Sequence, residues 1–182
     1  AAAPSEANYE YSYGRQNWFE RSAAEHRGAR EAVALFDQTS FSKFLVQGSD
    51  AAAVLNRICA NDIDVEPGRS VYSAWLNERG GIEADLTVNR VADDKFMVVT
   101  AVATQTRDMH WLRSNTPADA AVTCTDVTSA MSCLAVMGPN ARRLLQPLTD
   151  ADLSNEAFPF GTAQEIDLGY AKVRASRITY VG

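Results

Sequence analysis

The most regular alternation of apolar and polar positions in the chain lies in residues 77–88, NERGGIEADLTV. Two adjacent glycines predict a turn, and every second residue after them is apolar. Successive side chains of a strand point to opposite faces, so Glu83 and Asp85 project from one face, about 7 Å apart. The pattern predicts a strand with an apolar side and a carboxylate-bearing side. Because charged residues on a half-buried strand usually face water, we expect Glu83 to be solvated.

Comparable patterns predict the other elements. Apolar residues at every third or fourth position predict a helix over residues 19–35, after an N-terminal arm or linker of residues 1–18. Residues 42–48 predict a strand, and Ser49 or Asp50 is expected to cap the helix that follows it. The remaining predicted elements are strands 70–77, 82–91 and 96–102 in an antiparallel meander, helix 104–115, strands 121–127 and 132–138, and a hairpin within residues 161–182.

The strand–glycine–helix unit occurs twice, at an offset of 90 residues. Gly48 precedes a helix that contains Leu55, and Gly138 precedes one that contains Leu145. The offset holds in register, because 138 − 48 and 145 − 55 both equal 90. We therefore expect residues 19–182 to form one α+β domain. It would consist of two related strand–helix–hairpin halves with antiparallel sheets, packed sheet edge to sheet edge with the helices outside.

Composition supports a folded domain and argues against several classes of partner. Apolar residues make up 46% and charged residues 22% of the 182 residues, as in ordinary globular proteins. The net charge is −6 and no basic cluster extends beyond Arg142 and Arg143, so we expect no nucleic-acid partner. No apolar run approaches the roughly 20 residues that span a bilayer, so we expect no membrane partner. The opening residues do not resemble a secretory signal, and we expect a cytoplasmic location, with the mitochondrial matrix as the alternative.

The cysteines and histidines argue against disulfide and metal chemistry. Cys59, Cys124 and Cys133 are far apart and form no C-x-x-C pair, so we expect reduced thiols. Only two histidines are present, and no metal site is expected. Glycine-rich phosphate loops and the G-x-S-x-G motif of serine hydrolases are also absent from the sequence. Glu83 and Asp85 are left as the best polar pair for chemistry.

Residues 30–101 contain a run of spaced landmarks: Phe36-Asp37, Val46-x-Gly48, Asn61-Asp62, Gly68, Tyr72, Leu76-Asn77-Glu78, Gly80-Gly81-Ile82 and Asp85. In this order and spacing they resemble the folate-binding aminomethyltransferase fold, known from the glycine cleavage T-protein. The resemblance continues through residues 135–146 to the end of the chain, and so covers nearly everything after residue 20. The segments most similar to the folate domain of sarcosine and dimethylglycine dehydrogenases are residues 13–19, 82–88 and 153–175.

The resemblance also implies roles for individual residues. Asp85 matches the acidic residue that the family places beside the reacting nitrogens of tetrahydrofolate. Tyr72 matches a tyrosine of the folate pocket. Phe41 and Leu45 match apolar residues that line this pocket, with Phe41 at a position where methionine is common. Thr100 stands where the family usually has an asparagine.

The function that the resemblance implies is tetrahydrofolate-dependent one-carbon transfer. If the chain is the folate-binding portion of a sarcosine- or dimethylglycine-type dehydrogenase, the donor would be a small N-methyl amine, oxidised to an iminium. A stand-alone aminomethyltransferase of glycine cleavage, with an aminomethyl-lipoyl donor, is one alternative. A non-catalytic binding or scaffold module that keeps the fold is another. In either enzyme, the Asp85 carboxylate would accept a hydrogen bond from folate N10 and stabilise positive charge during the transfer.

Further parts of the family pattern lie outside these 182 residues. In the family, a glutamate that contacts the pterin follows the position of Gly182, and a C-terminal β-barrel comes later. FAD would be bound by a separate flavin domain, because nothing in the chain resembles a dinucleotide fold. We therefore expect a fragment of a larger polypeptide, which by itself binds folate weakly or not at all.

Overall fold

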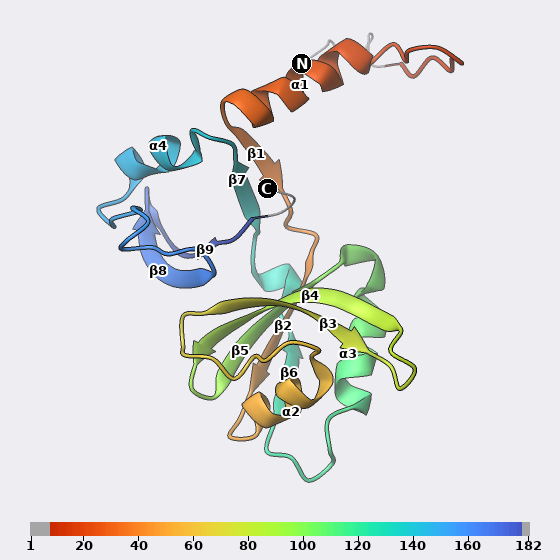
Figure 1. Ribbon diagram of the computed structural model, residues 1–182, viewed down its shortest axis with the longest axis vertical. Helices are drawn as coiled ribbons and strands as arrows, with labels where there is room; N and C mark the ends of the chain where they lie inside the picture. The colour runs from red at the N-terminus through yellow and green to blue at the C-terminus, as the bar shows by residue number, and fades with distance from the viewer. Residues whose placement is uncertain (1–7, 180–182) are drawn as a thin grey trace.

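The computed structural model describes residues 8–179 as three antiparallel sheets with short helices around them (Figure 1). The largest sheet has the strand order β3-β4-β5-β2-β6, while β1 pairs with β7 and β8 pairs with β9 in two separate ribbons. The predicted α+β class with antiparallel sheets is therefore confirmed. The strands are β1 (Ala34–Asp37), β2 (Ser42–Gln47), β3 (Ser70–Leu76), β4 (Ile82–Ala92), β5 (Lys95–Thr100), β6 (Thr123–Asp126), β7 (Leu134–Met137), β8 (Thr162–Leu168) and β9 (Ala171–Arg177). The helices are α1 (Phe19–Glu31), α2 (Ala51–Ile58), α3 (Gln105–Ser114) and α4 (Ala141–Leu145), with short 3-10 turns η2 (Val102–Thr104), η3 (Thr128–Ala130) and η4 (Gln146–Leu148).

The predicted meander forms one side of the large sheet. β3 pairs antiparallel with β4, and β4 pairs antiparallel with β5. β2 adds to the other edge of β5, and β6 adds to β2. The strand predicted over residues 42–48 and the helix predicted over residues 104–115 correspond to β2 and α3. Local alternation and helical spacing therefore placed the strands of the meander, β2 and α3.

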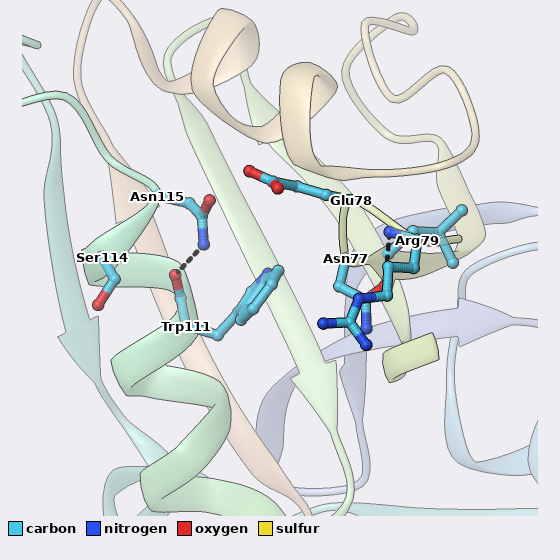
Figure 2. Close-up of a pocket in the computed structure, with 7 residues that line it drawn as sticks. Asn77, Glu78, Arg79, Trp111, Ser114 and Asn115 are labelled. Atoms are coloured by element: carbon cyan, nitrogen blue, oxygen red, sulfur yellow. Dashed lines mark hydrogen bonds between the residues drawn. The ribbon is translucent and has the colours of Figure 1, made fainter. Parts of the chain in front are cut away.

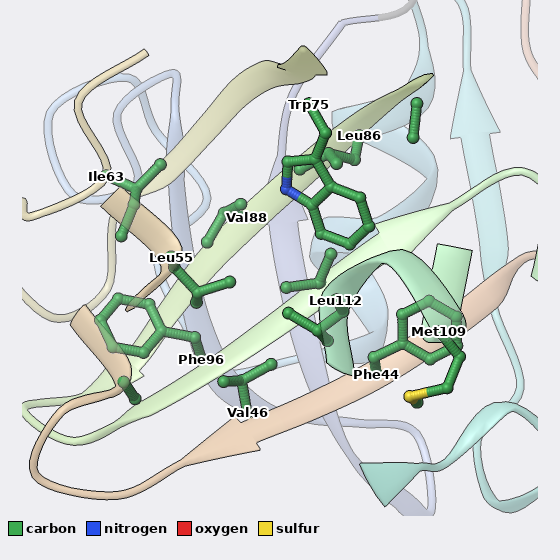
Figure 3. Close-up of a cluster of buried hydrophobic side chains, with 13 residues drawn as sticks. Phe44, Val46, Leu55, Ile63, Trp75, Leu86, Val88, Phe96, Met109 and Leu112 are labelled. Carbon is green, nitrogen blue, oxygen red and sulfur yellow. The ribbon is translucent and has the colours of Figure 1, made fainter. Parts of the chain in front are cut away.

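α2 and α3 cover one face of the large sheet. The main core lies between this face and the two helices (Figure 3). Ala84, Leu86 and Val88 of β4 point into this core, whereas Ile82 is 71% exposed at the start of the strand. The fully buried side chains of the core include Phe44, Val46, Leu55, Trp75, Phe96, Val98 and Leu112. Full burial of a large apolar side chain contributes about 1.5–3 kcal/mol. The helices therefore hold the sheet from one side, and Asp85 lies on the opposite side.

The first helix is shorter than the prediction for residues 19–35. α1 ends at Glu31, and Ala34–Asp37 forms β1 instead. β1 pairs antiparallel with β7, where Phe36 lies opposite Ala135. The predicted end of the helix is therefore wrong. The backbone N–H and C=O groups of residues 34–37 form hydrogen bonds with β7 instead of within a helix. α1 buries no side chain and projects away from the rest of the chain (Figure 1), so its predicted apolar stripe packs on no core.

The two glycine turns of the proposed repeat have similar backbones. Gly48 and Gly138 adopt positive φ angles of 139° and 119°, directly before α2 and α4. Asp50 and Asn140 stand at the N-caps of these helices. The Asp50 carboxylate does not cap α2 but accepts a hydrogen bond from the Ala121 amide at 2.7 Å. The duplication stays a prediction: the turns agree with it, while the strands of the second half form ribbons rather than a second large sheet.

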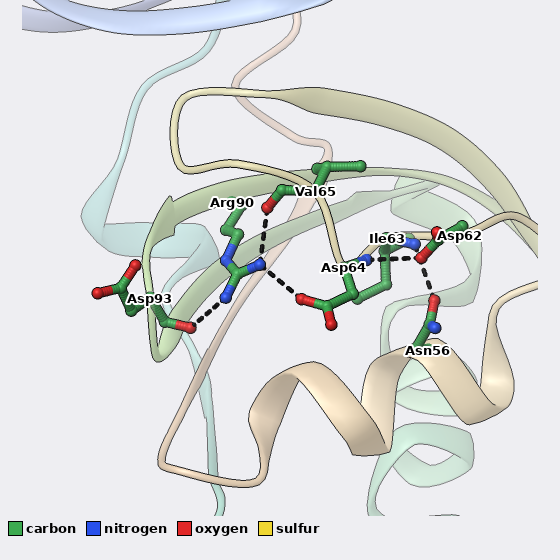
Figure 4. Close-up of polar contacts among 7 residues, drawn as sticks. All are labelled: Asn56, Asp62, Ile63, Asp64, Val65, Arg90 and Asp93. Atoms are coloured by element: carbon green, nitrogen blue, oxygen red, sulfur yellow. Dashed lines mark hydrogen bonds and ion pairs between the residues drawn. The ribbon is translucent and has the colours of Figure 1, made fainter.

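Arg90 ties the loop between α2 and β3 to the end of β4 (Figure 4). Its guanidinium forms an ion pair with Asp64, with 2.6 Å between Nη1 and Oδ1, and donates to the carbonyl of Val65 at 2.7 Å. Asn56 of α2 accepts a hydrogen bond from the Ile63 amide at 2.8 Å, and Ile63 is fully buried. The loop is thus fixed by specific bonds although it contains no regular structure.

Residues 1–7 of the predicted arm and residues 180–182 of the predicted hairpin lie outside the described residues. Within residues 8–179, no helix has the length and apolar character that crossing a membrane requires. The same residues hold no group of three or more His, Cys, Asp or Glu side chains placed to bind a metal ion. Cys59, Cys124 and Cys133 are free thiols, and burial raises the pKa of Cys59 and of Cys124.

Candidate functional site

Asp85 and Tyr72 lie side by side on the face of the large sheet opposite α2 and α3. They come from the neighbouring strands β4 and β3, where Asp85 lies opposite Ala74 and Tyr72 lies opposite Thr87. The Tyr72 hydroxyl donates to Oδ2 of Asp85 at 3.3 Å. Both side chains are exposed, that of Tyr72 to 66%. The pair therefore presents a carboxylate and an aromatic ring on the same open surface.

The β8–β9 hairpin covers the other end of this face. Ser176 of β9 donates to Oδ1 of Asn89 on β4 at 3.5 Å, and Ser70 donates to the same oxygen at 2.5 Å. Asn89 is buried, whereas Asp85, four residues earlier on the strand, is exposed. The face therefore has a covered end and an open end, and the Asp85 carboxylate lies at the open end.

A depression of about 250 Å³ lies beside Asp85. Asp108, in its wall, is 1% exposed and accepts a hydrogen bond from the Thr104 hydroxyl at 2.7 Å. Nε of Arg107 lies 3.5 Å from Oδ1 of Asp108. Three carboxylates therefore line the depression: Asp85 is exposed, Glu83 is half-buried, and Asp108 is buried, with a hydroxyl donor and a cation beside it. Its lining residues are Ile82, Glu83, Ala84, Asp85, Ala101, Thr104, Arg107 and Asp108.

Phe41 and Leu45 lie at β2, further across the same sheet. Leu45 alternates with the core residues Phe44 and Val46, so it points to the face that carries Asp85, and it is half-buried. Phe41 is half-buried in the turn before β2. The ammonium of Lys43 fixes this turn by donating to the carbonyls of Phe41 at 2.7 Å and Thr39 at 2.9 Å.

Thr100 lies apart from the other predicted site residues. Alternation along β5 places it with Phe96 and Val98 on the face that the helices cover, and it is 4% exposed. Its Oγ1 is buried and has no hydrogen-bond partner among residues 8–179. It directly precedes Ala101, which lines the depression. Asp85 and Tyr72 thus lie at the open end of one face, Leu45 lies on the same face in the row of Asn89, and Thr100 lies on the opposite face.

Glu83 is half-buried, whereas the alternation predicted a solvated side chain. Asn77, in the turn before β4, donates to its Oε1 at 2.9 Å. The pairing of β3 with β4 shifts between Trp75 and Leu76, so that Glu83 has no partner in the register. The alternation of apolar and polar residues continues unchanged across this shift in strand pairing. The sequence pattern therefore could not reveal that Glu83 is half-buried.

A larger hollow of about 510 Å³ lies between the β3–β4 turn and the end of α3 (Figure 2). Asn115 donates to the carbonyl of Trp111 at 2.9 Å on one side of it. None of the five predicted site residues lines this hollow, so it is separate from the candidate site. Its lining residues are Leu76, Asn77, Glu78, Arg79, Trp111, Ser114 and Asn115.

Sequence reasoning missed three charged residues around the site, namely Lys43, Arg107 and Asp108. Charged side chains are almost never buried unless they are paired, and the sequence analysis gave Lys43 and Asp108 no role. A signal was available for Lys43, since it stands inside the apolar strand 42–48. No comparable signal marks Arg107 and Asp108, which are adjacent on a helix of mixed polarity.

Comparison with known proteins adds a family to this geometry. The model of the GCVT N-terminal domain matches residues 4–182. Among solved structures, the chain is similar to the glycine cleavage system aminomethyltransferase T from Bartonella henselae. That similarity has a TM-score of 0.69 at 26% identity, and covers 87% of this chain and 43% of the other.

Two curated relatives match nearly the whole chain. It is 44% identical to the 4-methylaminobutanoate oxidase (formaldehyde-forming) of Paenarthrobacter nicotinovorans, over 96% of this chain and 21% of the relative. It is 32% identical to the mitochondrial dimethylglycine dehydrogenase of Rattus norvegicus, over 97% of this chain and 21% of the relative. The chain thus spans about a fifth of the length of these relatives. By the match over residues 4–182, the chain belongs to the GCVT N-terminal domain family, as its landmarks predicted.

Proposed function

We propose that the chain is the folate-binding portion of a demethylating flavoenzyme, in which the carbon of an oxidised N-methyl amine is transferred to tetrahydrofolate. The observation that carries this proposal is the Tyr72–Asp85 pair on the open face of the large sheet. A 4-methylaminobutanoate oxidase and a dimethylglycine dehydrogenase among the relatives support an N-methyl amine as donor. Family membership supports tetrahydrofolate as acceptor.

Asp85 has the central chemical role in this proposal. Tetrahydrofolate, when bound, supplies the N5 and N10 nitrogens that take up the one-carbon unit. The Asp85 carboxylate would accept a hydrogen bond from N10–H, and it would take up the proton that N10 loses when this nitrogen displaces the donor amine from the carbon. The amine would leave with the electrons of its C–N bond and with the proton of N5. The negative charge of Asp85 also stabilises the positive charge of the arriving iminium. Tyr72 donates to Oδ2 and so orients the carboxylate for both tasks.

The described residues fit one edge of a folate. Asp85 offers an acceptor for N–H groups, Tyr72 offers an exposed aromatic ring, and Leu45 adds apolar surface on the same face. The depression beside Asp85 measures about 250 Å³, which is below the roughly 300–1,000 Å³ of most small-molecule sites. It therefore accommodates part of the ligand, in keeping with weak folate binding by these residues alone.

The proposal assigns the oxidation to another part of the protein. FAD would be bound by a flavin domain of a longer polypeptide, which would also include a C-terminal β-barrel. The share of the relatives' length that the chain spans, about a fifth, supports such further domains. We keep the cytoplasm as the proposed location, with the mitochondrial matrix as the alternative because one relative is described as mitochondrial.

A second candidate is the aminomethyl transfer of glycine cleavage. The observation that favours it is the similarity to an aminomethyltransferase of the glycine cleavage system, at a TM-score of 0.69. Here the donor would be an aminomethyl group on a lipoyl carrier. Asp85 would have the same role, because the arriving carbon is again electrophilic and an N–H proton must again be removed.

The test uses the full-length gene product, supplied with sarcosine, dimethylglycine or 4-methylaminobutanoate, with and without tetrahydrofolate. We expect amine oxidation in both cases, with 5,10-methylene-tetrahydrofolate replacing free formaldehyde as the product when folate is present. Aminomethyl-lipoyl turnover without amine oxidation would favour the second candidate. A protein that neither binds tetrahydrofolate nor alters the formaldehyde yield would contradict both, and would leave a non-catalytic module.

A further inference from the structure

The stretch of β4 that carries Asp85 has an unusual backbone environment. β5 pairs with β4 only from Thr87 onward, so residues 82–86 have no strand on that side. On the other side, the register shift between Trp75 and Leu76 leaves Glu83 without a partner on β3. Glu83, two residues before Asp85, is therefore a strand residue that neither neighbouring strand holds in register.

Arg107 of α3 supplies a partner at this position. Its Nη2 donates a hydrogen bond to the backbone carbonyl of Glu83. The helix begins just after β5 ends, so it reaches the stretch of β4 that β5 leaves unpaired. Irregularities of this kind concentrate next to functional sites, where they redirect a side chain. The guanidinium thus holds the backbone where the strand ladder does not.

Asp108 in turn holds Arg107. Its carboxylate is 1% exposed, and burying a charge is costly unless the charge is paired and hydrogen-bonded. Asp108 has both kinds of partner: Nε of Arg107 lies 3.5 Å from Oδ1, and the Thr104 hydroxyl donates to Oδ2 at 2.7 Å. A single set of bonds therefore connects the turn after β5, the first turns of α3 and the start of β4.

We propose that Arg107, held by the buried Asp108, is a positioning residue that fixes the start of β4 and thereby the Asp85 carboxylate. The inference rests on the proposed function, because it assumes that the position of Asp85 matters for one-carbon transfer. Arg107 and Asp85 line the same depression, so a displacement of the Glu83 peptide moves one wall of the site relative to the other. Arg107 acts through Asp85 and needs no contact with the ligand.

The test compares Arg107→Met with Arg113→Met in the full-length protein. Arg113 is an exposed arginine on the same helix that lines no part of the depression, and so is the matched control. We expect Arg107→Met to lower kcat for methylene-tetrahydrofolate formation about tenfold, with the KM for tetrahydrofolate changed less than about threefold. Arg107→Lys keeps one donor for the Glu83 carbonyl and is expected to recover part of the rate. Arg113→Met is expected to match the wild-type protein.

Two further measurements separate positioning from a general structural effect. Amide exchange in residues 82–86 is expected to rise about tenfold in Arg107→Met and to stay unchanged in Arg113→Met. In the double variant with Asp85→Asn, Arg107→Met is expected to add almost nothing, because the carboxylate charge that it positions is already gone.

Additive losses of rate in the double variant would overturn the inference. Faster amide exchange in Arg107→Met without any loss of kcat would overturn it as well. Neither result would contradict the proposed function. A wild-type protein that forms no methylene-tetrahydrofolate would instead overturn the proposed function. The exchange comparison would then still decide whether Arg107 fixes the start of β4.

Discussion

Asp85→Asn is expected to lower the rate of one-carbon transfer to tetrahydrofolate by about 100-fold or more, the contribution that general acid–base groups typically make. Asparagine keeps the shape of the side chain and still accepts the Tyr72 hydrogen bond, but it removes the negative charge and the basic oxygen. Tetrahydrofolate binding is expected to be partly retained, because the apolar face around Leu45 is unchanged. The measurement is methylene-tetrahydrofolate formation by the full-length protein, with the folate dissociation constant determined in parallel.

Asp167→Asn is the matched control for this prediction. Asp167 is a highly exposed carboxylate on the strand β8, and it forms a 3.7 Å ion pair with Lys172. Its replacement is expected to leave the transfer rate unchanged. Full turnover in Asp85→Asn would remove Asp85 from the chemistry, whatever the control does.

Gly48→Ala is expected to have the largest effect on stability, a loss of about 3 kcal/mol or more of unfolding free energy. Gly48 has a φ of 139°, and a Cβ there would lie 1.9 Å from the Ala121 carbonyl oxygen. The backbone of residue 121 would have to move, although the Asp50 carboxylate holds its amide. Urea denaturation, followed by tryptophan fluorescence, to which the buried Trp75 contributes, measures the change.

Gly28→Ala provides the contrast. Gly28 lies within α1 and a Cβ there meets no atom within 4 Å, so alanine is expected to be neutral or to stabilise by up to about 1 kcal/mol. Equal unfolding free energies for the two variants would show that the Gly48 turn relaxes, and would remove the steric argument for glycine at this position.

An element could be predicted from the sequence where the local spacing of its apolar residues is enough to determine whether it is a strand or a helix. The alternation of residues 82–88 and the helical spacing of residues 104–115 both correspond to observed elements, since each buries the side that its pattern marks as apolar. The end of α1 could not be predicted in this way. Residues 34–37 pair with β7, about 100 residues later, and nothing in the local pattern reports that partner.

The candidate site was only partly predictable for the same reason. Asp85 and Tyr72 were chosen by family resemblance, and the fold brings them together on one face through a hydrogen bond. The buried charges of Lys43 and Asp108 depend on carbonyl, hydroxyl and guanidinium groups that come together only in the folded chain. The shift of register at Glu83 is invisible in the sequence because residue types alternate across it.

The most direct test of the central claim is a structure of the full-length protein with 5-formyl-tetrahydrofolate bound. We expect the pteridine on the open face of the large sheet, with an Asp85 carboxylate oxygen about 3 Å from folate N10. A ligand bound elsewhere, with the Asp85 carboxylate still surrounded by solvent, would contradict the central claim.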